Sequence, residues 1–157
     1  VEQTLSTTVD TALGRVRLEG KIDRIDVAQN SGEVRIIDYK TGSVVPNDLN
    51  IKEIESLTMS PDYPKAFQLM QYALMYNDAH PGKPVIAGNI SLRNHTLGFI
   101  SPQFPETCSS TLEALGEFRA NLILLIENML DKNQPFTQTE NKDLCAFCDY
   151  KQICNRT

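Results

Sequence analysis

The sequence contains little histidine and no excess of positive charge, and both shortages exclude functions. Two histidines, His80 and His95, occur among the 157 residues, and both lie outside the acidic and cysteine clusters of the chain. A histidine nucleophile or a three-histidine metal site is therefore excluded, and we expect His80 at a helix end and His95 in a turn. The net charge is −5, although nonspecific binding to duplex DNA comes largely from lysine and arginine. We therefore expect that this chain does not grip DNA strongly by itself.

Long apolar runs, low-complexity tracts and internal repeats are also missing from the sequence. No segment is long enough in apolar residues to span a bilayer, so we expect a soluble, cytoplasmic protein with no membrane partner. The chain has no initiator methionine and does not open on a basic segment followed by an apolar one, so we expect a fragment of a larger protein. Its 157 residues, 41% of them apolar, suffice for one hydrophobic core. They predict a single domain over residues 1–157.

Two β-branched segments flank a cluster of turn residues in the first third of the chain. They run from Lys21 to Val27 and from Val34 to Thr41, and the turn residues between them predict a β-hairpin. A turn centred on the middle of that cluster places Asp23 directly opposite Asp38. Two carboxylates are then expected to face each other across the hairpin.

This hairpin brings acidic and basic groups together on one face. Side chains alternate along a strand, so Asp38 and Lys40 project from the same face. Like charges placed opposite each other destabilise a strand pair, and a divalent cation would remove the conflict between Asp23 and Asp38. Mg²⁺ typically takes one or two carboxylates and leaves positions for water and phosphate, and a nearby lysine could orient or deprotonate the water or neutralise phosphate charge. The pattern predicts phosphodiester hydrolysis with Mg²⁺ or Mn²⁺; the alternative is a solvated strand face.

The same residues carry a resemblance to a known family. Gly-Lys-Ile-Asp-Arg-Ile-Asp from Gly20, followed by Ile-Ile-Asp-Tyr-Lys-Thr-Gly from Ile36, resembles the PD-(D/E)xK nuclease superfamily. The match is closest to the RecB and AddB type of nuclease domain, at the C-terminal end of bacterial helicase-nucleases. The resemblance implies an α/β (α+β) fold with a mixed central β-sheet flanked by helices, as in restriction endonucleases. It implies catalytic or metal-binding roles for Asp23, Asp38, Lys40 and the backbone carbonyl of Tyr39.

A helix expected from Tyr63 to Asp78 carries two further candidates. Pro64 fits its first turn, and apolar residues follow a helical period. Gln68 and Tyr72 are one turn apart and therefore neighbours on the helix surface; by themselves they read as polar surface residues. Gln-Leu-Met-Gln-Tyr, however, is similar to the Gln-apolar-x-x-Tyr motif of RecB-like nucleases. That similarity implies that Gln68 bonds near the lysine or the scissile phosphate and that Tyr72 supports it.

Three of the four cysteines lie in the tail formed by residues 144–157. The spacing of Cys145, Cys148 and Cys154 suits a thiolate-bound zinc ion or iron-sulfur cluster, either of which needs four ligands. A disulfide or free thiols are the alternatives, and a cytosolic setting disfavours the disulfide. The triplet also resembles that of AddB-type nucleases, which implies a 4Fe-4S cluster in the full-length protein. The fourth ligand stays open, because Cys108 lies where the family pattern expects none.

The remaining elements are expected from periodicity and turn signals. We expect a hairpin over residues 4–19, whose second strand continues through Gly20 into Asp23 as one long element. Residues 43–61 have no clear period and predict a mobile excursion with one short helix. A core strand is expected from Pro84 to Leu92, a strand over residues 97–100, and a long helix from the capping box at Ser110.

These observations lead to one predicted function and two alternatives. We predict a metal-dependent DNA nuclease, the exonuclease domain of a helicase-nuclease in DNA repair or recombination, with DNA and a helicase domain or subunit as partners. The second possibility is a catalytically inactive nuclease-like module for DNA binding or assembly, and the third a zinc or redox unit built on the cysteines. The presence of Asp23, Asp38 and Lys40 favours the first.

Overall fold

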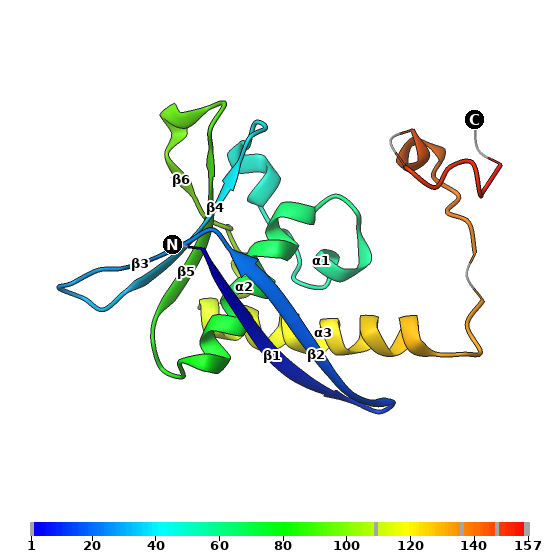
Figure 1. The fold of residues 1–157 in the computed structure, drawn as a ribbon, viewed down its shortest axis with the longest axis horizontal. Coiled ribbons are helices and arrows are strands. Elements are labelled where there is room, and N and C mark those ends of the chain that lie inside the picture. Colours follow the sequence, from blue (N-terminus) through cyan, green and yellow to red (C-terminus); the bar gives the residue numbers. More distant parts are fainter. Residues whose placement is uncertain (1, 109, 136, 147, 156–157) are drawn as a thin grey trace.

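The computed structural model describes residues 2–108, 110–135, 137–146 and 148–155 of the chain (Figure 1). The chain opens with a two-stranded antiparallel sheet, formed by β1 (Gln3–Thr11) and β2 (Gly14–Ile22). The tight turn between them places Gly14 at φ +126°, a backbone conformation that favours glycine. The first predicted hairpin is therefore confirmed.

A second, four-stranded sheet forms the centre of the molecule. Its strands are, in order, β3 (Arg24–Val27), β4 (Val34–Lys40), β5 (Val85–Ser91) and β6 (Phe99–Ile100). Strands β4 and β5 run parallel, whereas β3 and β6 pair antiparallel with their neighbours. The predicted α/β fold with a mixed central sheet is confirmed.

Helices pack against both sheets. The α-helices of the described residues are α1 (Ser56–Met59), α2 (Pro64–Ala79) and α3 (Thr111–Leu130), and the 3-10 helices are η1 (Pro46–Leu49), η2 (His95–Leu97) and η3 (Lys142–Cys145). The Ser110 hydroxyl accepts the Glu113 N–H at 3.2 Å and caps α3, as its sequence signal predicts. None of the described helices is both long and apolar enough to cross a membrane.

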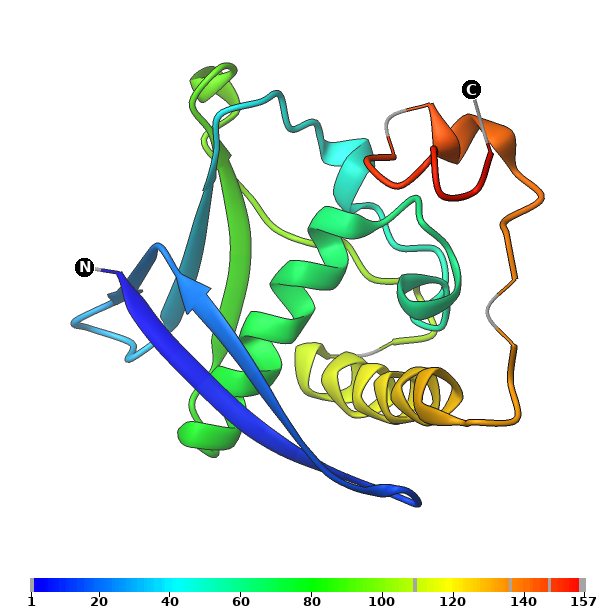
Figure 2. The ribbon, with the colours of Figure 1, turned by 45° about the vertical axis from the view of Figure 1, so that its right-hand side comes forward.

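Helix α2 is the centre of the core. Figure 2 shows it between the central sheet, the β1–β2 hairpin and α3. Most of its side chains are buried: Ala66, Leu69, Met70, Tyr72, Ala73, Leu74, Met75 and Tyr76. The Asp78 carboxylate accepts hydrogen bonds from Thr7 of β1 and Arg119 of α3 and so ties three elements together.

The hairpin approaches α2 closely at Gly20. A Cβ atom there would lie 2.5 Å from Cε of Met75 and 2.9 Å from Cε1 of Tyr72, both in α2. Such distances are shorter than van der Waals contact, so only glycine fits without displacement. The close packing of the hairpin on α2 therefore depends on a glycine at this position.

The predicted strand does run through Gly20 as β2, but it ends at Ile22 and does not reach Asp23, where the chain bends. Strand β2 pairs with β1 up to Ile22, and β3 pairs with β4 from Arg24 onward. One bend thus moves the chain from one sheet to the other. It also places Asp23 outside either ladder.

Residues 43–61 were expected to be mobile but instead pack into the core. Their buried apolar side chains are Val44, Leu49, Ile51, Ile54 and Leu57, each exposed by 3% or less. Backbone bonds between Ile51 and Gln103, and between Gln103 and Leu49, both 2.9 Å, tie the segment to the chain after β6. The apolar residues lack a regular period because the segment is irregular, with only η1 and α1 as short helices.

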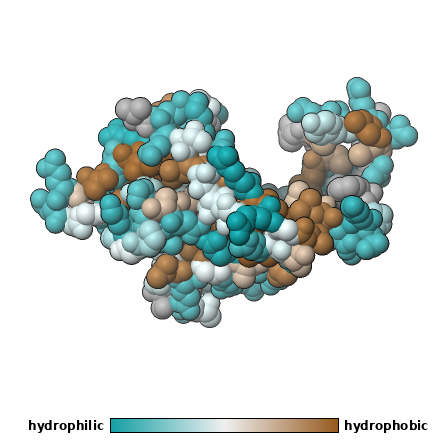
Figure 3. All heavy atoms as spheres, turned by 60° about the horizontal axis from the view of Figure 1, so that its bottom comes forward, coloured by the Kyte–Doolittle hydropathy of each residue, from teal (hydrophilic) through white to brown (hydrophobic). Residues whose placement is uncertain are grey.

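Apolar groups also remain at the surface, chiefly on α3 and in the tail. Side chains exposed by 50% or more include Leu112, Leu124, Met129, Leu130, Tyr150 and Ile153. Figure 3 shows hydrophobic atoms among hydrophilic ones on this side of the molecule, and the tail stands apart from the sheets and helices. The tail therefore shares little of the core.

Candidate active site

Asp38 lies near the end of β4 with its side chain among core residues. Val34, Ile36 and Asp38 alternate along the strand and are exposed by 0%, 0% and 5%, so this face of β4 points into the core. An ionised carboxylate in such surroundings is costly unless hydrogen bonds and an opposite charge compensate it. The neighbouring groups supply both.

Lys40 follows Asp38 on the same face and bridges β4 to α2. Its Nζ atom lies 2.9 Å from Oδ2 of Asp38 and 2.6 Å from Oε1 of Gln68. The Gln68 amide in turn donates to the Tyr72 hydroxyl at 2.8 Å. The four residues predicted from the strand and helix motifs thus form one continuous chain, joined by one ion pair and two hydrogen bonds.

Asp23 reaches the same strand by a different route. Its Oδ2 atom accepts the backbone N–H of Tyr39 at 2.8 Å. Even-numbered residues of β4 direct their backbone groups to β5, as the bonds of Val34 and Lys40 with that side show, so Tyr39 directs its groups to the β3 side. The Asp23 side chain takes the place of a missing strand partner there.

The predicted direct pairing of Asp23 with Asp38 is therefore wrong in one respect. The register is as expected, since Arg24 pairs with Ile37 and Ile25 with Ile36. The ladder, however, ends one pair before the two aspartates, because the chain bends at Asp23. The Asp38 carboxylate projects from β4 itself, whereas the Asp23 carboxylate reaches the end of β4 from the bend between β2 and β3.

The two carboxylates nevertheless act on a common neighbour. Burial raises the pKa of Tyr72, the hydrogen bond from Gln68 opposes that rise, and the negative charges of Asp38 and Asp23 raise the pKa further. Tyr72 therefore lies within the electric field of both aspartates. The site is a region of concentrated negative charge that contains one lysine ammonium.

The donor set fits a hard divalent cation. Within the described residues, Oδ1 of Asp23 and Oδ1 of Asp38 accept no hydrogen bond, and Oδ2 of Asp23 lies against the Tyr39 backbone. Mg²⁺ prefers oxygen ligands and commonly takes just one or two carboxylates. The absence of any group of three His, Cys, Asp or Glu side chains with metal-binding geometry among those residues is thus compatible with such a site.

Asn89 is a site residue that sequence reasoning missed. It lies opposite Asp38 in the parallel β4–β5 ladder, is fully buried, and donates from Nδ2 to Oδ2 of Asp38 at 2.8 Å. The available signal was a polar amide inside the apolar strand Val85–Ser91. Without knowledge of the parallel register, that signal did not connect it to Asp38.

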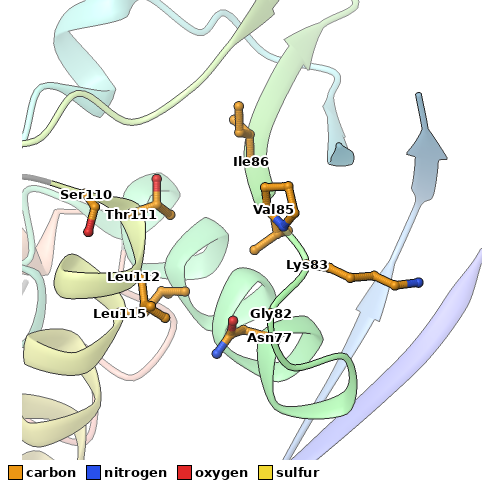
Figure 4. Close-up of a pocket in the computed structure, with 10 residues that line it drawn as sticks. Asn77, Gly82, Lys83, Val85, Ile86, Ser110, Thr111, Leu112 and Leu115 are labelled. Atoms are coloured by element: carbon orange, nitrogen blue, oxygen red, sulfur yellow. The ribbon is translucent and has the colours of Figure 1, made fainter. Parts of the chain in front are cut away.

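One cavity of the described residues lies away from this site. It has a volume of about 410 Å³ and lies where β5 begins, between Val85 and Ile86 on one side and Thr111 and Leu115 on the other (Figure 4). Its lining includes no carboxylate, and the Lys83 side chain points away from it. Lys40, by contrast, lies where β5 ends, beside Ser91.

The cysteines of the tail are not brought together as a ligand set. Cys145, Cys148 and Cys154 are unpaired and half-buried, and no three metal-binding side chains cluster in the described part of the chain. The N–H of Cys148 bonds to the carbonyl of Cys145 at 3.2 Å, within successive turns after η3. Cys108 lies far along the chain, with its Sγ 3.3 Å from the Ser110 carbonyl.

The histidines occupy the positions expected of them. His80 ends α2 and contacts the Tyr76 ring, with 4.5 Å between the ring centroids. His95 begins the short helix η2 after β5. Neither contributes to the hydrogen-bonded chain around Lys40.

Comparison with known proteins agrees with the family resemblance of the sequence motifs. Residues 1–155 match the family model of the PD-(D/E)XK nuclease superfamily, whose members are generally metal-dependent nucleases that hydrolyse phosphodiester bonds. No curated protein and no solved structure matches the chain significantly. On the strength of a match over nearly its whole length, the chain belongs to the PD-(D/E)XK nuclease superfamily.

Proposed function

We propose that the chain is the nuclease domain of a Mg²⁺-dependent deoxyribonuclease. Asp23, Asp38 and the Tyr39 carbonyl would hold Mg²⁺ or Mn²⁺, and Lys40, Gln68 and Tyr72 would complete the site. The observation that carries the proposal is the position of Lys40 Nζ, 2.9 Å from the Asp38 carboxylate and 2.6 Å from Gln68. A structural ion pair would not need the helix side chain as a second anchor.

The geometry assigns a task to each protein group. A bound divalent cation supplies Lewis acidity toward phosphate and a more acidic water. The Lys40 ammonium has three N–H donors; Gln68 accepts one and Asp38 pairs with its charge, so a further N–H can donate to a phosphate oxygen or to the attacking water. The Lys40 side chain is 27% exposed and that of Asp38 is 7% exposed, so substrate can reach the ammonium while the carboxylate stays shielded.

Gln68 and Tyr72 hold this ammonium in place. The Gln68 carbonyl accepts from Lys40 while its amide donates to the Tyr72 hydroxyl, which fixes the orientation of the amide. Helix α2 is packed on most sides, so these side chains start from a rigid element. Groups positioned before substrate arrives need not reorganise during the reaction.

The proposal that the chain is a nuclease of the RecB and AddB type rests on the order of motifs along the chain. The acidic hairpin, the Gln68 helix and the cysteine triplet occur in the order found in RecB and AddB nucleases, which supports an exonuclease of a cytoplasmic helicase-nuclease in DNA repair or recombination. The net charge of −5 supports a helicase domain or subunit as the source of a basic DNA channel. Cys145, Cys148 and Cys154 would bind a 4Fe-4S cluster together with a fourth ligand.

Cleavage of linear single- and double-stranded DNA in Mg²⁺ tests the proposal. Lys40→Ala should lose cleavage by roughly 10²–10³-fold, the usual cost of removing one transition-state donor. Lys83→Ala is the matched control, because it removes a lysine at the other end of β5. Equal cleavage by the parent protein and Lys40→Ala would contradict the mechanism, and DNA binding with no cleavage by either would favour an inactive binding module.

A further inference from the structure

Asn89 stands out among the buried polar side chains of the described residues. These are Asp38, Asn89 and Ser91. Asn89 lies in β5, which pairs with β4 on one side and β6 on the other. Val85 and Ala87, which precede Asn89 on the same α2-facing side of β5, are apolar and buried. An apolar residue would suit this position better, because a buried amide loses its hydration. The fold therefore keeps an amide there for a reason other than packing.

The hydrogen bonds of Asn89 are directed at one partner. Its Nδ2 atom donates to Oδ2 of Asp38 at 2.8 Å and approaches the Asp38 carbonyl at 3.4 Å. Oδ2 of Asp38 thus accepts the Asn89 amide and pairs with the Lys40 ammonium, while Oδ1 accepts no hydrogen bond from the described residues. The two oxygens of the Asp38 carboxylate therefore have different contacts.

The orientation of the amide is fixed by charge. If the amide were reversed, Oδ1 of Asn89 would face a carboxylate oxygen with no proton between them. In the observed orientation, Oδ1 of Asn89 is instead the one buried side-chain polar atom without a partner in the described part of the chain. The fold tolerates one unsatisfied oxygen in order to keep the donor on Asp38.

We propose that Asn89 is a positioning residue that holds Oδ2 of Asp38 toward Lys40 and leaves Oδ1 for the cation. The inference rests on the proposed function, because it assigns Asn89 a task at the same site. Groups one step removed from a metal orient the ligands that touch it. Asn89 acts through Asp38 and has no contact with the reacting phosphate.

Calorimetric titration with Mn²⁺ tests this assignment. We expect Asn89→Leu, which keeps the number and branching of the side-chain heavy atoms but removes the donor, to weaken Mn²⁺ binding roughly 10–100-fold. Ser91→Ala is the matched control, since Ser91 is fully buried on the same face of β5 but bonds only to backbone groups of Gly42 and Asn94. We expect its affinity to stay within about threefold of the parent value, as it leaves the Asp38 bonds intact.

Two results would overturn the assignment. One is equal Mn²⁺ affinity in the parent protein and Asn89→Leu; the other is an equal loss in Asn89→Leu and Ser91→Ala, which would indicate a general packing defect. If Asn89→Leu does not fold, Asn89→Val replaces it, because a β-branched side chain suits a strand. The same outcomes then apply.

A second measurement separates this inference from the proposed function. If the parent protein binds no Mn²⁺, the proposed metal site fails, and crystal structures of the parent and Asn89→Leu then decide the role of Asn89. We expect the Asp38 carboxylate of the variant to turn away from Lys40. An unchanged contact between Asp38 and Lys40 in that structure would overturn the inference.

Discussion

The acidic site at the end of β4 and the cysteine tail carry the two clearest motifs of this chain, but the fold positions only one of them. Asp38, Lys40 and Gln68 project from a buried strand and a packed helix and are joined by bonds of 2.9 and 2.6 Å. Cys145, Cys148 and Cys154 lie in successive turns outside the core and form no ligand cluster within the described residues. Figure 1 shows the tail apart from the central sheet.

The difference shows how the two motifs depend on their surroundings. Side chains on packed elements are oriented before any ligand arrives, because the core fixes the backbone from which they start. A motif on a segment with little core of its own needs the ligand to order it, so its binding energy is also its folding energy. We therefore expect changes in the first region to affect chemistry and changes in the tail to affect metal content.

The largest expected effect follows from the loss of the Asp38 charge. Asp38→Asn should lower the rate of DNA cleavage by roughly 10²–10³-fold or more, because it removes a charged ligand from a metal-dependent site. Steady-state cleavage assays measure this loss. Asp26→Asn, which changes an exposed aspartate bonded to Arg24 in the same hairpin, should retain activity within about threefold. Comparable losses in both variants would remove the special status of Asp38.

A substitution in the tail should change the iron content of the protein rather than its Mn²⁺ affinity. In protein prepared without oxygen, Cys148→Ser should lower the iron content, because a cluster loses a thiolate ligand. Its Mn²⁺ affinity should stay within about twofold of the parent value, since distant sites are usually independent. Elemental analysis and calorimetry measure the two quantities. A large loss of Mn²⁺ binding in this variant would show that the two regions are coupled.

The close contact between Gly20 and α2, the helix that carries Gln68 and Tyr72, should contribute to the stability of the fold. Gly20→Ala should lower the free energy of unfolding by about 1–3 kcal/mol, because its Cβ would overlap Met75 and Tyr72. Gly42→Ala is the control, as no atom lies within 4 Å of a Cβ at that position. Urea unfolding gives both values. Equal stabilities of the two variants would contradict the close packing described for α2.

The smallest expected effect concerns Tyr72 at high pH. Because its pKa is raised in the folded state, Tyr72 stabilises the fold fully below pH 10, its usual pKa, and this contribution is lost as pH rises through the folded-state value. Between pH 9 and pH 11 the parent protein should lose more stability than Tyr72→Phe. Tyr150→Phe, at an exposed position in the tail, should follow the parent. Identical pH profiles for the parent protein and Tyr72→Phe would argue against the burial of this phenol.

Much of the first region could be predicted from the sequence because its signals are local. The alternation around Asp38, the turn before Val34 and the helical period around Gln68 act over a few residues. The bend at Asp23 could not be predicted, since it follows from β2 and β3 pairing with different strands. Asn89 was missed for a similar reason: only the parallel register, set by the crossover through α2, brings it to Asp38.

The packing of residues 43–61 shows a further limit of sequence reasoning. Their apolar residues follow no clear period, so a mobile segment with one short helix was expected, yet Ile51 and Ile54 are each 1% exposed. Burial there depends on bonds to the distant Gln103, which a local pattern cannot reveal. In the tail, the cysteine spacing predicts a ligand set, but no neighbouring core fixes where the thiols lie.

A crystal structure of the protein in Mn²⁺, with the ion located by its anomalous scattering, tests the central proposal most directly. We expect the anomalous peak beside Asp38, within coordination distance of Asp23, Asp38 and the Tyr39 carbonyl. A peak confined to other residues, or none at saturating Mn²⁺, would contradict the assignment of these groups to metal-dependent hydrolysis.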